Sequence, residues 1–256
     1  DTLDVLPSKV TATGFSDAAA HRQPMSPIYN QYTRLNADPE HDPSREGERM
    51  IFGPLFKTGF LIEHFLRSEN WFGASQLVVT SASSKTAMGL ASVVRDRSPA
   101  MKRIGLTSAG NVAFVEASGL YDVTLAYEAM ASIPRDRSVS VDFAGNGALL
   151  GAIHRHFGDA LSYSCLVGAT HIDARGQGSA NDLPGPVPTL FFAPDHAVEL
   201  FQSLGPEEAG RQIASSWTRF LSDCGDSVTI ETVEGLPAAA GLFARMVTGQ
   251  VDPAKG

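Results

Sequence analysis

The stretch QLVVTSASSKTAMGLASVV, residues 76–94, decides the fold. It predicts a short buried strand over 76–80, a loop of small polar residues with a lysine, and an apolar helix over 85–95. A strand that runs into a helix through such a loop usually holds a phosphate, because the first helical amides point at the ligand. The loop from Ser81 to Thr86 contains no glycine, although phosphate loops normally need glycine for their tight backbone path.

Strands and helices alternate along the rest of the chain. We expect further strands over 103–108, 123–127, 138–145, 161–169 and 228–233, and helices over 48–67, 111–119, 148–158, 206–223 and 237–249. Pro54 is expected to start or break the first of these helices. Alternation at this spacing implies crossover connections on a parallel sheet, the pattern of an α/β fold.

The first 49 residues have a different character. Residues 1–13 alternate weakly, as a strand or a sheet edge would, and residues 14–49 are rich in proline, aspartate and other turn formers. We expect irregular structure or short helices there. The chain begins at Asp1 rather than at a methionine, and we expect it to be a segment of a longer protein.

Composition limits the classes of partner. The 256 residues are 43% hydrophobic and carry a formal net charge of −8, which disfavours non-specific binding to nucleic acid or to an anionic membrane. No apolar run reaches the roughly 18 residues of a membrane span. Cys165 and Cys224 are expected to be buried free thiols, which fits a reducing cytoplasm.

The loop has several chemical interpretations. A nucleoside-triphosphate loop would have glycines before Lys85-Thr86, at the positions that Val79 and Ser84 occupy. The one convincing carboxylate for Mg²⁺ at the end of a later strand is Asp142. A serine–lysine nucleophile would need serine at Ala82, and no G-x-S-x-G elbow is present.

A dinucleotide loop fits the small residues better. Ser81, Ser83 and Thr86 fall near its glycine positions, the hydroxyl of Ser84 adds another donor, and Lys85 could neutralise a phosphate. The alternative is a solvated serine-rich turn with an ordinary helix cap. The loop alone leaves both interpretations open.

Four stretches resemble the cofactor domain of the medium-chain dehydrogenases/reductases, in their zinc-independent quinone- and enoyl-reductase branch. They are LFKTGFLIEHFL (55–66), VDFAGNGAL (141–149), YSCLVGAT (163–170) and VEGLPAAAGLFARMVTGQVDPAKG (233–256). A second resemblance is to an uncharacterised family, known only as a domain of unknown function, within or beside that branch. The stretches that carry it are SASSKTAMGLA, GLTSAGNVAFVE, YNQY and DFAGNGALLGAIHRHFGDAL.

This resemblance implies a domain organisation and a set of nicotinamide contacts. Residues 1–49 would be the last part of a GroES-like substrate domain, residues 50–225 a Rossmann-type cofactor domain, and residues 226–256 a segment returning to the substrate domain. The resemblance also implies a possible homodimer, through an edge strand of the cofactor domain. The residues implied to lie beside the cofactor are Thr58, Gly145, Gly168, Ala169 and Thr170.

The cofactor is expected to be NADP(H) rather than NAD(H). An acidic residue at the end of the second strand would bind the ribose hydroxyls of NAD, and here that strand ends at Ser108 without one. Ser108 and Asn111 can donate to a 2′-phosphate, and Lys85, Arg95 or Lys102 could add charge. Alternatively, Ser108 only caps the next helix.

The proton donor is less well specified. Tyr29 and Tyr32, with Asn30 orienting them, could serve a reductase without zinc, and Lys57 and His171 are further candidates. The alternative is that both tyrosines are half-buried packing residues with a polar end. No metal is expected, because the two cysteines are scattered and two histidines of one helix, His154 and His156, face different directions.

These observations predict an α/β fold with a Rossmann-type doubly wound parallel sheet and part of a substrate domain. The predicted function is NADP(H)-dependent reduction of a small molecule, an activated carbonyl, quinone or enone. The first alternative is a non-catalytic nucleotide-binding scaffold or sensor. The second is a phosphotransferase that uses Lys85 and Thr86.

Overall fold

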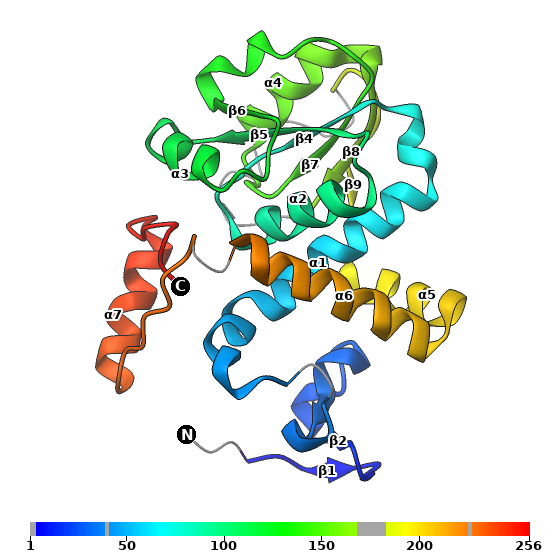
Figure 1. Cartoon of the computed structure of the whole chain (residues 1–256), viewed down its shortest axis with the longest axis vertical. Helices are drawn as coiled ribbons and strands as arrows, with labels where there is room; N and C mark the ends of the chain where they lie inside the picture. The colour runs from blue at the N-terminus through cyan, green and yellow to red at the C-terminus, as the bar shows by residue number, and fades with distance from the viewer. Residues whose placement is uncertain (1–3, 39–40, 168–182, 225–226) are drawn as a thin grey trace. The chain divides into compact units, whose positions relative to one another are not determined.

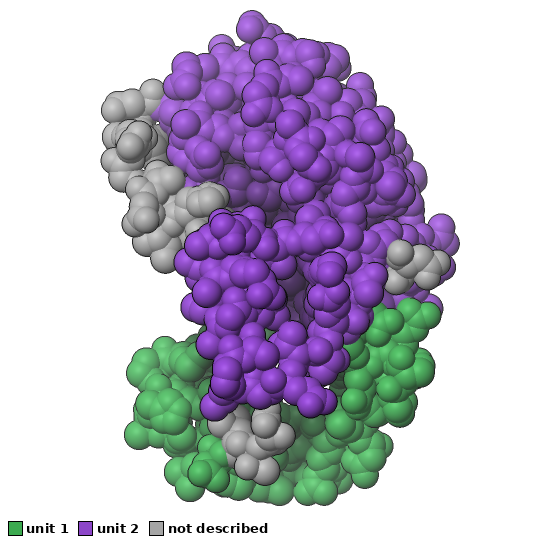
Figure 2. Space-filling model, turned by 90° about the vertical axis from the view of Figure 1, so that its left-hand side faces the viewer, with its two compact units in different colours: residues 1–49 green, residues 50–256 purple. Residues whose placement is uncertain are grey.

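The computed structural model describes residues 4–38, 41–167, 183–224 and 227–256. The chain divides into two compact units, Asp1–Arg49 and Met50–Gly256, which Figure 2 colours separately. Each unit has its own sheet, and the units are described one at a time.

The first unit is built on a small antiparallel sheet. Its strands are β1 (Pro7–Ser8), β2 (Gly14–Asp17) and β3 (Gln31–Thr33), and two short 3₁₀ helices lie between β2 and β3. Phe15 pairs with Tyr32 across β2 and β3, and their rings stack with centroids 4.9 Å apart. The expected strand over residues 1–13 is therefore reduced to β1, whereas the expected irregular part contributes the two longer strands.

The second unit contains a parallel sheet of six strands in the order β6-β5-β4-β7-β8-β9 (Figure 1). These strands are β4 (Gln76–Val79), β5 (Lys102–Thr107), β6 (Val123–Ala126), β7 (Ser138–Asp142), β8 (Leu161–Leu166) and β9 (Thr189–Leu190). In chain order this is 3-2-1-4-5-6, the doubly wound arrangement of the Rossmann fold. The fold class predicted from the alternation is confirmed.

Helices cover both faces of this sheet. The described α-helices are α1 (Glu46–Ser68), α2 (Lys85–Arg97), α3 (Val112–Ala117), α4 (Gly147–Phe157), α5 (Ala193–Leu204), α6 (Pro206–Cys224) and α7 (Leu236–Val247), and α7 has no buried residue. Figure 1 shows α2 and α4 on opposite faces. Successive residues of β4 point to opposite faces of the sheet. Leu77 and Val79 belong to the hydrophobic core on the α2 side, and Val78 belongs to a second core on the α4 side.

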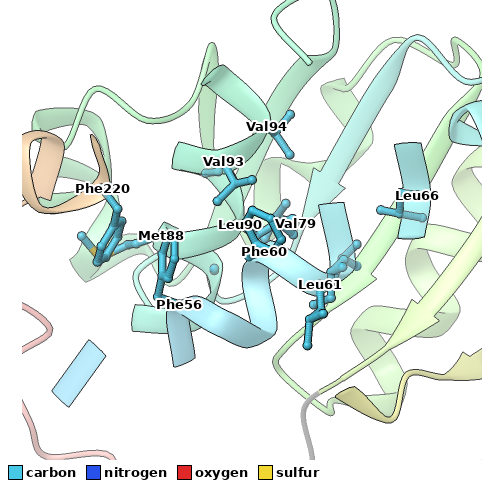
Figure 3. Close-up of a cluster of buried hydrophobic side chains, with 14 of the residues drawn as sticks. Phe56, Phe60, Leu61, Leu66, Val79, Met88, Leu90, Val93, Val94 and Phe220 are labelled. Atoms are coloured by element: carbon cyan, nitrogen blue, oxygen red, sulfur yellow. The ribbon is translucent and has the colours of Figure 1, made fainter. Parts of the chain in front are cut away.

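The larger core lies between the sheet, α1, α2 and α6. Phe56, Met88 and Phe220 meet there from these three helices, as Figure 3 shows, and the rings of Phe56 and Phe220 are 5.2 Å apart. Two glycines let α1 and α2 approach closely. A Cβ atom added to Gly59 would lie 2.5 Å from the backbone nitrogen of Leu90, and one added to Gly89 would lie 3.1 Å from the Cα of Phe56.

Two expectations about the elements are wrong, and two elements, α5 and β9, were not expected. Pro54 lies inside α1. In a regular helix the amide of residue 54 would donate to the carbonyl of Met50, but proline has no N–H. Met50 is 80% exposed. The proline-rich stretch before residue 206 contains a further helix, α5, which has Pro194 in its first turn and is separated from α6 by Gly205 at φ +78°. Residues 228–233 form no strand, and only Thr229 makes a bridge, with Lys255.

Several side chains that could suggest chemistry are structural. Cys165 and Cys224 are buried free thiols, and burial raises the pKa of both. His154 is buried between the carbonyl of Pro184 and the hydroxyl of Ser164, and burial lowers its pKa. In the described part of the chain, no three His, Cys, Asp or Glu side chains are placed to share a metal ion. The described helices include none that is long and apolar enough to cross a membrane.

Candidate functional site

The site lies where the strand order reverses. β4 has β5 on one side and β7 on the other, so the connections after β4 and β7 lead to opposite faces of the sheet. A crevice forms outside the carboxyl ends of two such strands, and ligands of open α/β sheets bind there. The glycine-free loop follows β4 at this point.

Backbone contacts hold the loop in a fixed path. Ser81 adopts φ +49°, a left-handed conformation that is unusual for a residue other than glycine. The amide of Ala82 donates to the carbonyl of Leu106 at 2.9 Å, and the hydroxyl of Ser84 caps α2 by accepting from the amide of Ala87. The loop therefore makes its tight turn with serine, where the dinucleotide-binding motif has glycine.

A tyrosine from the third strand supports this turn. The hydroxyl of Tyr127, which follows β6, lies 3.2 Å from the amide nitrogen of Ser81 and 3.3 Å from its Oγ. On the other side of the loop, Asn111 Nδ2 donates to the Oγ of Ser83 at 3.2 Å. These side chains pin the loop to the ends of β5 and β6, which helps to hold Ser81 in its strained conformation.

A buried carboxyl group joins the two strands at the reversal. The hydroxyl of Thr80 accepts from the amides of Phe143 and Ala144 and donates to Oδ1 of Asp142 at 2.5 Å. The amide of Gly145, at φ +64°, donates to the other carboxyl oxygen. Asp142 is 3% exposed; burial raises the pKa of its carboxyl and these hydrogen bonds oppose the rise. Asp142 therefore shapes the crevice and is not available as a ligand for Mg²⁺.

Replacing Thr80 by valine should destabilise the protein by about 1–3 kcal/mol, the cost of removing a hydrogen-bond partner from a buried charged group. The change keeps the shape of the side chain and removes the hydroxyl that Asp142 accepts from. Thr107→Val is the matched control, because this buried threonine at the end of β5 makes only a 3.4 Å contact with Ser83. Equal unfolding free energies for the two variants in urea titrations would contradict the role given to Thr80.

Lys85 and Thr86 open α2. Their amides belong to the first turn, where the helix itself supplies no acceptors, and the positive end of the helix dipole lies there. The ammonium of Lys85 donates to the carbonyls of Pro253 at 3.1 Å and of Lys255 at 2.6 Å. Burial lowers the pKa of Lys85 and nearby Asp252 opposes the shift. The site therefore offers amide, hydroxyl and ammonium donors together.

The end of β5 carries no carboxylate. Ser108 follows the strand, is exposed, and occupies the N-cap position of the next turn, although its side chain makes no capping hydrogen bond there. Two cations expected near it lie elsewhere. Lys102 begins β5 at the opposite end of the strand, and Arg95 lies in the last turn of α2, where it pairs with Asp223.

The candidate catalytic residues fall in both units. Tyr29 and Tyr32 belong to the first unit, where Tyr32 stacks on Phe15. Asn30 does not orient either tyrosine, because its amide exchanges hydrogen bonds with Arg22. Lys57 and Thr58 lie on α1, and the Thr58 hydroxyl donates to the carbonyl of Pro54. Gly168, Ala169, Thr170 and His171 lie outside the described residues.

Sequence reasoning missed three contributors to the site. Tyr127 directly follows the third strand, and the rule that strand ends meet at one edge of the sheet could have identified it. Thr80 could have been found in the same way. The carbonyls of Pro253 and Lys255 left no signal, since any residue supplies a carbonyl and the contact spans 168 positions or more.

Two bacterial proteins of known structure are similar to this chain. The Escherichia coli K-12 protein YHDH, solved with bound NADPH, is 14% identical, with a TM-score of 0.52 over 87% of this chain and 64% of its own. The yhdH oxidoreductase from Salmonella enterica, solved in complex with NADP, is 16% identical, with a TM-score of 0.49 over 79% of this chain and 60% of its own. The chain thus spans less than two thirds of either protein.

The sequence itself also places the chain in a family. No protein of curated function matches it. Residues 1–252 match the family described as "Protein of unknown function (DUF2855)". The predicted resemblance to an uncharacterised family, known only as a domain of unknown function, is confirmed by this match. The chain belongs to the DUF2855 family.

Proposed function

We propose that this protein binds NADP(H) at the carboxyl ends of β4 and β7 and reduces an activated carbonyl, quinone or enone by hydride transfer. The observation that carries the proposal is a loop at the reversal of the sheet that brings together amide and hydroxyl donors and an ammonium group, beside a strand end without a carboxylate. The two solved structures of this fold were obtained with NADP or NADPH, which supports the choice of cofactor.

The residues fit a dinucleotide in a definite way. The amides of Lys85 and Thr86, with the hydroxyl of Ser83, would bind the pyrophosphate, while Ser81 and Ser84 keep the loop and the helix start in shape. Ser108 and Asn111 would donate to the 2′-phosphate of the adenosine ribose. A carboxylate at Ser108 would repel that phosphate, and its absence therefore favours NADP(H) over NAD(H).

The cofactor supplies the hydride, and the protein orients it and the substrate. Gly145 follows the strand end at Asp142, where the absence of a side chain leaves room for the nicotinamide end. Thr58, Gly168, Ala169 and Thr170 are proposed neighbours of that ring on the resemblance alone. Zinc has no part in the proposal.

A proton must reach the reduced substrate, and three residues are proposed for this step. Tyr32 lines a hollow of about 330 Å³ in the first unit, together with Phe15 and Gln31. Tyr29 is half exposed, and Lys57 lies on α1. Tyr29→Phe and Tyr32→Phe keep the rings and remove the hydroxyls, so a lower kcat with an unchanged Kd for NADPH would identify the donor.

A non-catalytic nucleotide-binding scaffold is the second candidate. The observation that favours it is that donors of the loop already have partners in the protein, since Tyr127 contacts the amide of Ser81 and two carbonyls hold Lys85. The phosphotransferase alternative loses support, because Asp142 accepts from Thr80, Ala144 and Gly145.

Oxidation of NADPH in the presence of quinones and enones separates the reductase from the scaffold. The expected result is NADPH consumption that depends on both protein and acceptor. Binding of NADPH without turnover of any acceptor in the panel would favour the scaffold.

We further propose that the protein acts in the cytoplasm, on a small molecule rather than on nucleic acid or a membrane, and that two copies can pair through an edge strand.

A further inference from the structure

The segment 252–256, here called the C-terminal segment, is docked against residues 228–231. The amide of Thr229 donates to the carbonyl of Ala254 at 2.8 Å, the amide of Gly256 returns a bond to the carbonyl of Thr229 at 3.0 Å, and the amide of Glu231 donates to the carbonyl of Gly256 at 2.7 Å. An ion pair between the side chains of Lys255 and Glu231 adds to these bonds. The segment is therefore held by its backbone, largely independently of its side chains.

Apolar packing fixes the same segment from a second side. A Cβ atom added to Gly256 would lie 2.9 Å from Cδ1 of Ile51 and 3.3 Å from the side chain of Val228. A larger residue at this position would push the segment away from α1. The path of the segment past Lys85 thus depends on both the Thr229 bonds and the Gly256 contact.

The docked segment presents two carbonyl oxygens to a single ammonium group. Lys85 donates to the carbonyls of Pro253 and Lys255, which lie two residues apart in the segment. A lysine ammonium has three N–H groups, so one donor is left for a further acceptor. The side chain that carries it starts at the first residue of α2, next to the loop amides.

We infer that the C-terminal segment is a positioning element for Lys85, whose two carbonyls hold the ammonium so that its third N–H meets a phosphate oxygen of the nucleotide. The inference rests on the proposed function. A free lysine side chain loses rotamer freedom when it binds a phosphate, and a lysine that is already held loses less. The C-terminal segment thereby pre-organises a phosphate-binding group, as the backbone does in glycine-rich loops.

A double-mutant cycle tests this coupling. Lys85→Met removes the ammonium and keeps the length of the side chain, and Thr229→Pro removes the amide that binds the carbonyl of Ala254. Removing a charged hydrogen bond to the ligand should weaken NADPH binding about tenfold or more. Thr229→Pro should weaken it about threefold to tenfold through lost positioning. The double variant should bind no more weakly than Lys85→Met alone.

Val233→Pro is the matched control, because Val233 is an exposed residue of the same extended stretch and its change leaves the bonds at Thr229 and Glu231 in place. Gly256→Val is a second way to displace the segment, should Thr229→Pro not fold. Each variant is compared by circular dichroism and melting before NADPH fluorescence titrations. In addition, NMR of protein labelled with ¹³C-lysine should show the Lys85 Cε signal moving in Thr229→Pro and not in Val233→Pro.

The outcomes separate this inference from the proposed function. If the unmodified protein binds neither NADPH nor inorganic pyrophosphate, the proposed function fails and the phosphate role of Lys85 fails with it. If NADPH binds and Thr229→Pro leaves its Kd unchanged, tightens it, or adds its effect fully to that of Lys85→Met, the proposed function stands and the positioning role is wrong. A Lys85 signal that does not respond to Thr229→Pro would also overturn the inference.

Discussion

Ser108→Asp should weaken NADPH binding about 100-fold and leave NADH binding unchanged or tighter. Ser108 is exposed directly after β5, the strand end that contacts the adenosine ribose in Rossmann folds. Two like charges about 6 Å apart repel by about 3 kcal/mol at an effective dielectric constant near 20, which is about 100-fold in Kd. The same carboxylate can accept hydrogen bonds from the two ribose hydroxyls of NADH. Fluorescence titrations with NADPH and with NADH measure whether the preference changes from NADPH to NADH.

Ala100→Asp is the control for this substitution. It adds the same charge in an exposed turn just before β5, at the end of the strand opposite to Ser108. Its effect on either Kd should be small, because charges separated by more than a Debye length of about 10 Å are screened at 0.1 M salt. An equal loss of NADPH binding in both variants would show that Ser108 does not face the 2′-phosphate.

Gly59→Ala should lower the free energy of unfolding by about 2–3 kcal/mol, at the upper end of the usual cost of overpacking a core. The new Cβ would lie 2.5 Å from the backbone nitrogen of Leu90. A backbone atom cannot rotate away as a side chain can, so α1 and α2 must separate. The loop stands at the start of α2, and we expect NADPH affinity to fall together with stability.

Gly210→Ala in α6 is the matched control. A Cβ atom at this position has no neighbour within 4 Å among the described residues. Alanine is favoured over glycine in a helix by about 1 kcal/mol, so this variant should be more stable than the parent protein. Unfolding in urea, followed by circular dichroism, compares the two. The packing account of Gly59 would be wrong if Gly59→Ala matched the parent in stability.

Periodicity was sufficient to predict five of the six strands of the sheet, whereas the two-residue strand β9 was missed. Buried runs such as 76–80 alternate with apolar helices, and connection rules then leave few topologies. The elements that failed depended on tertiary surroundings. Pro54 is tolerated because its turn of α1 faces solvent at Met50, and α5 begins inside a proline-rich stretch where local propensity favours a loop. Both cases show packing and solvation overriding a local signal.

The candidate site was predictable where residues stand next to an element boundary. Ser81 to Thr86 and Ser108 follow strand ends and could be placed by that fact alone. The hydrogen bonds between Thr80 and Asp142, and between Tyr127 and Ser81, join residues 46 to 62 positions apart. Nothing in a single sequence gives such pairs, because many side chains could satisfy the same donor. The anchoring of Lys85 by backbone carbonyls is still less visible.

The central claim is that the crevice at β4 and β7 binds NADP(H), and direct titration of the protein tests it. NADPH, NADH and ATP–Mg²⁺ are added in turn, with nicotinamide fluorescence and the melting temperature recorded. A ligand present at 100 times its Kd stabilises the native state by about 2.7 kcal/mol, which is readily seen as a rise in Tm. We predict saturable binding and a rise in Tm with NADPH, a smaller rise with NADH and none with ATP–Mg²⁺. No response to either nicotinamide nucleotide would contradict the account.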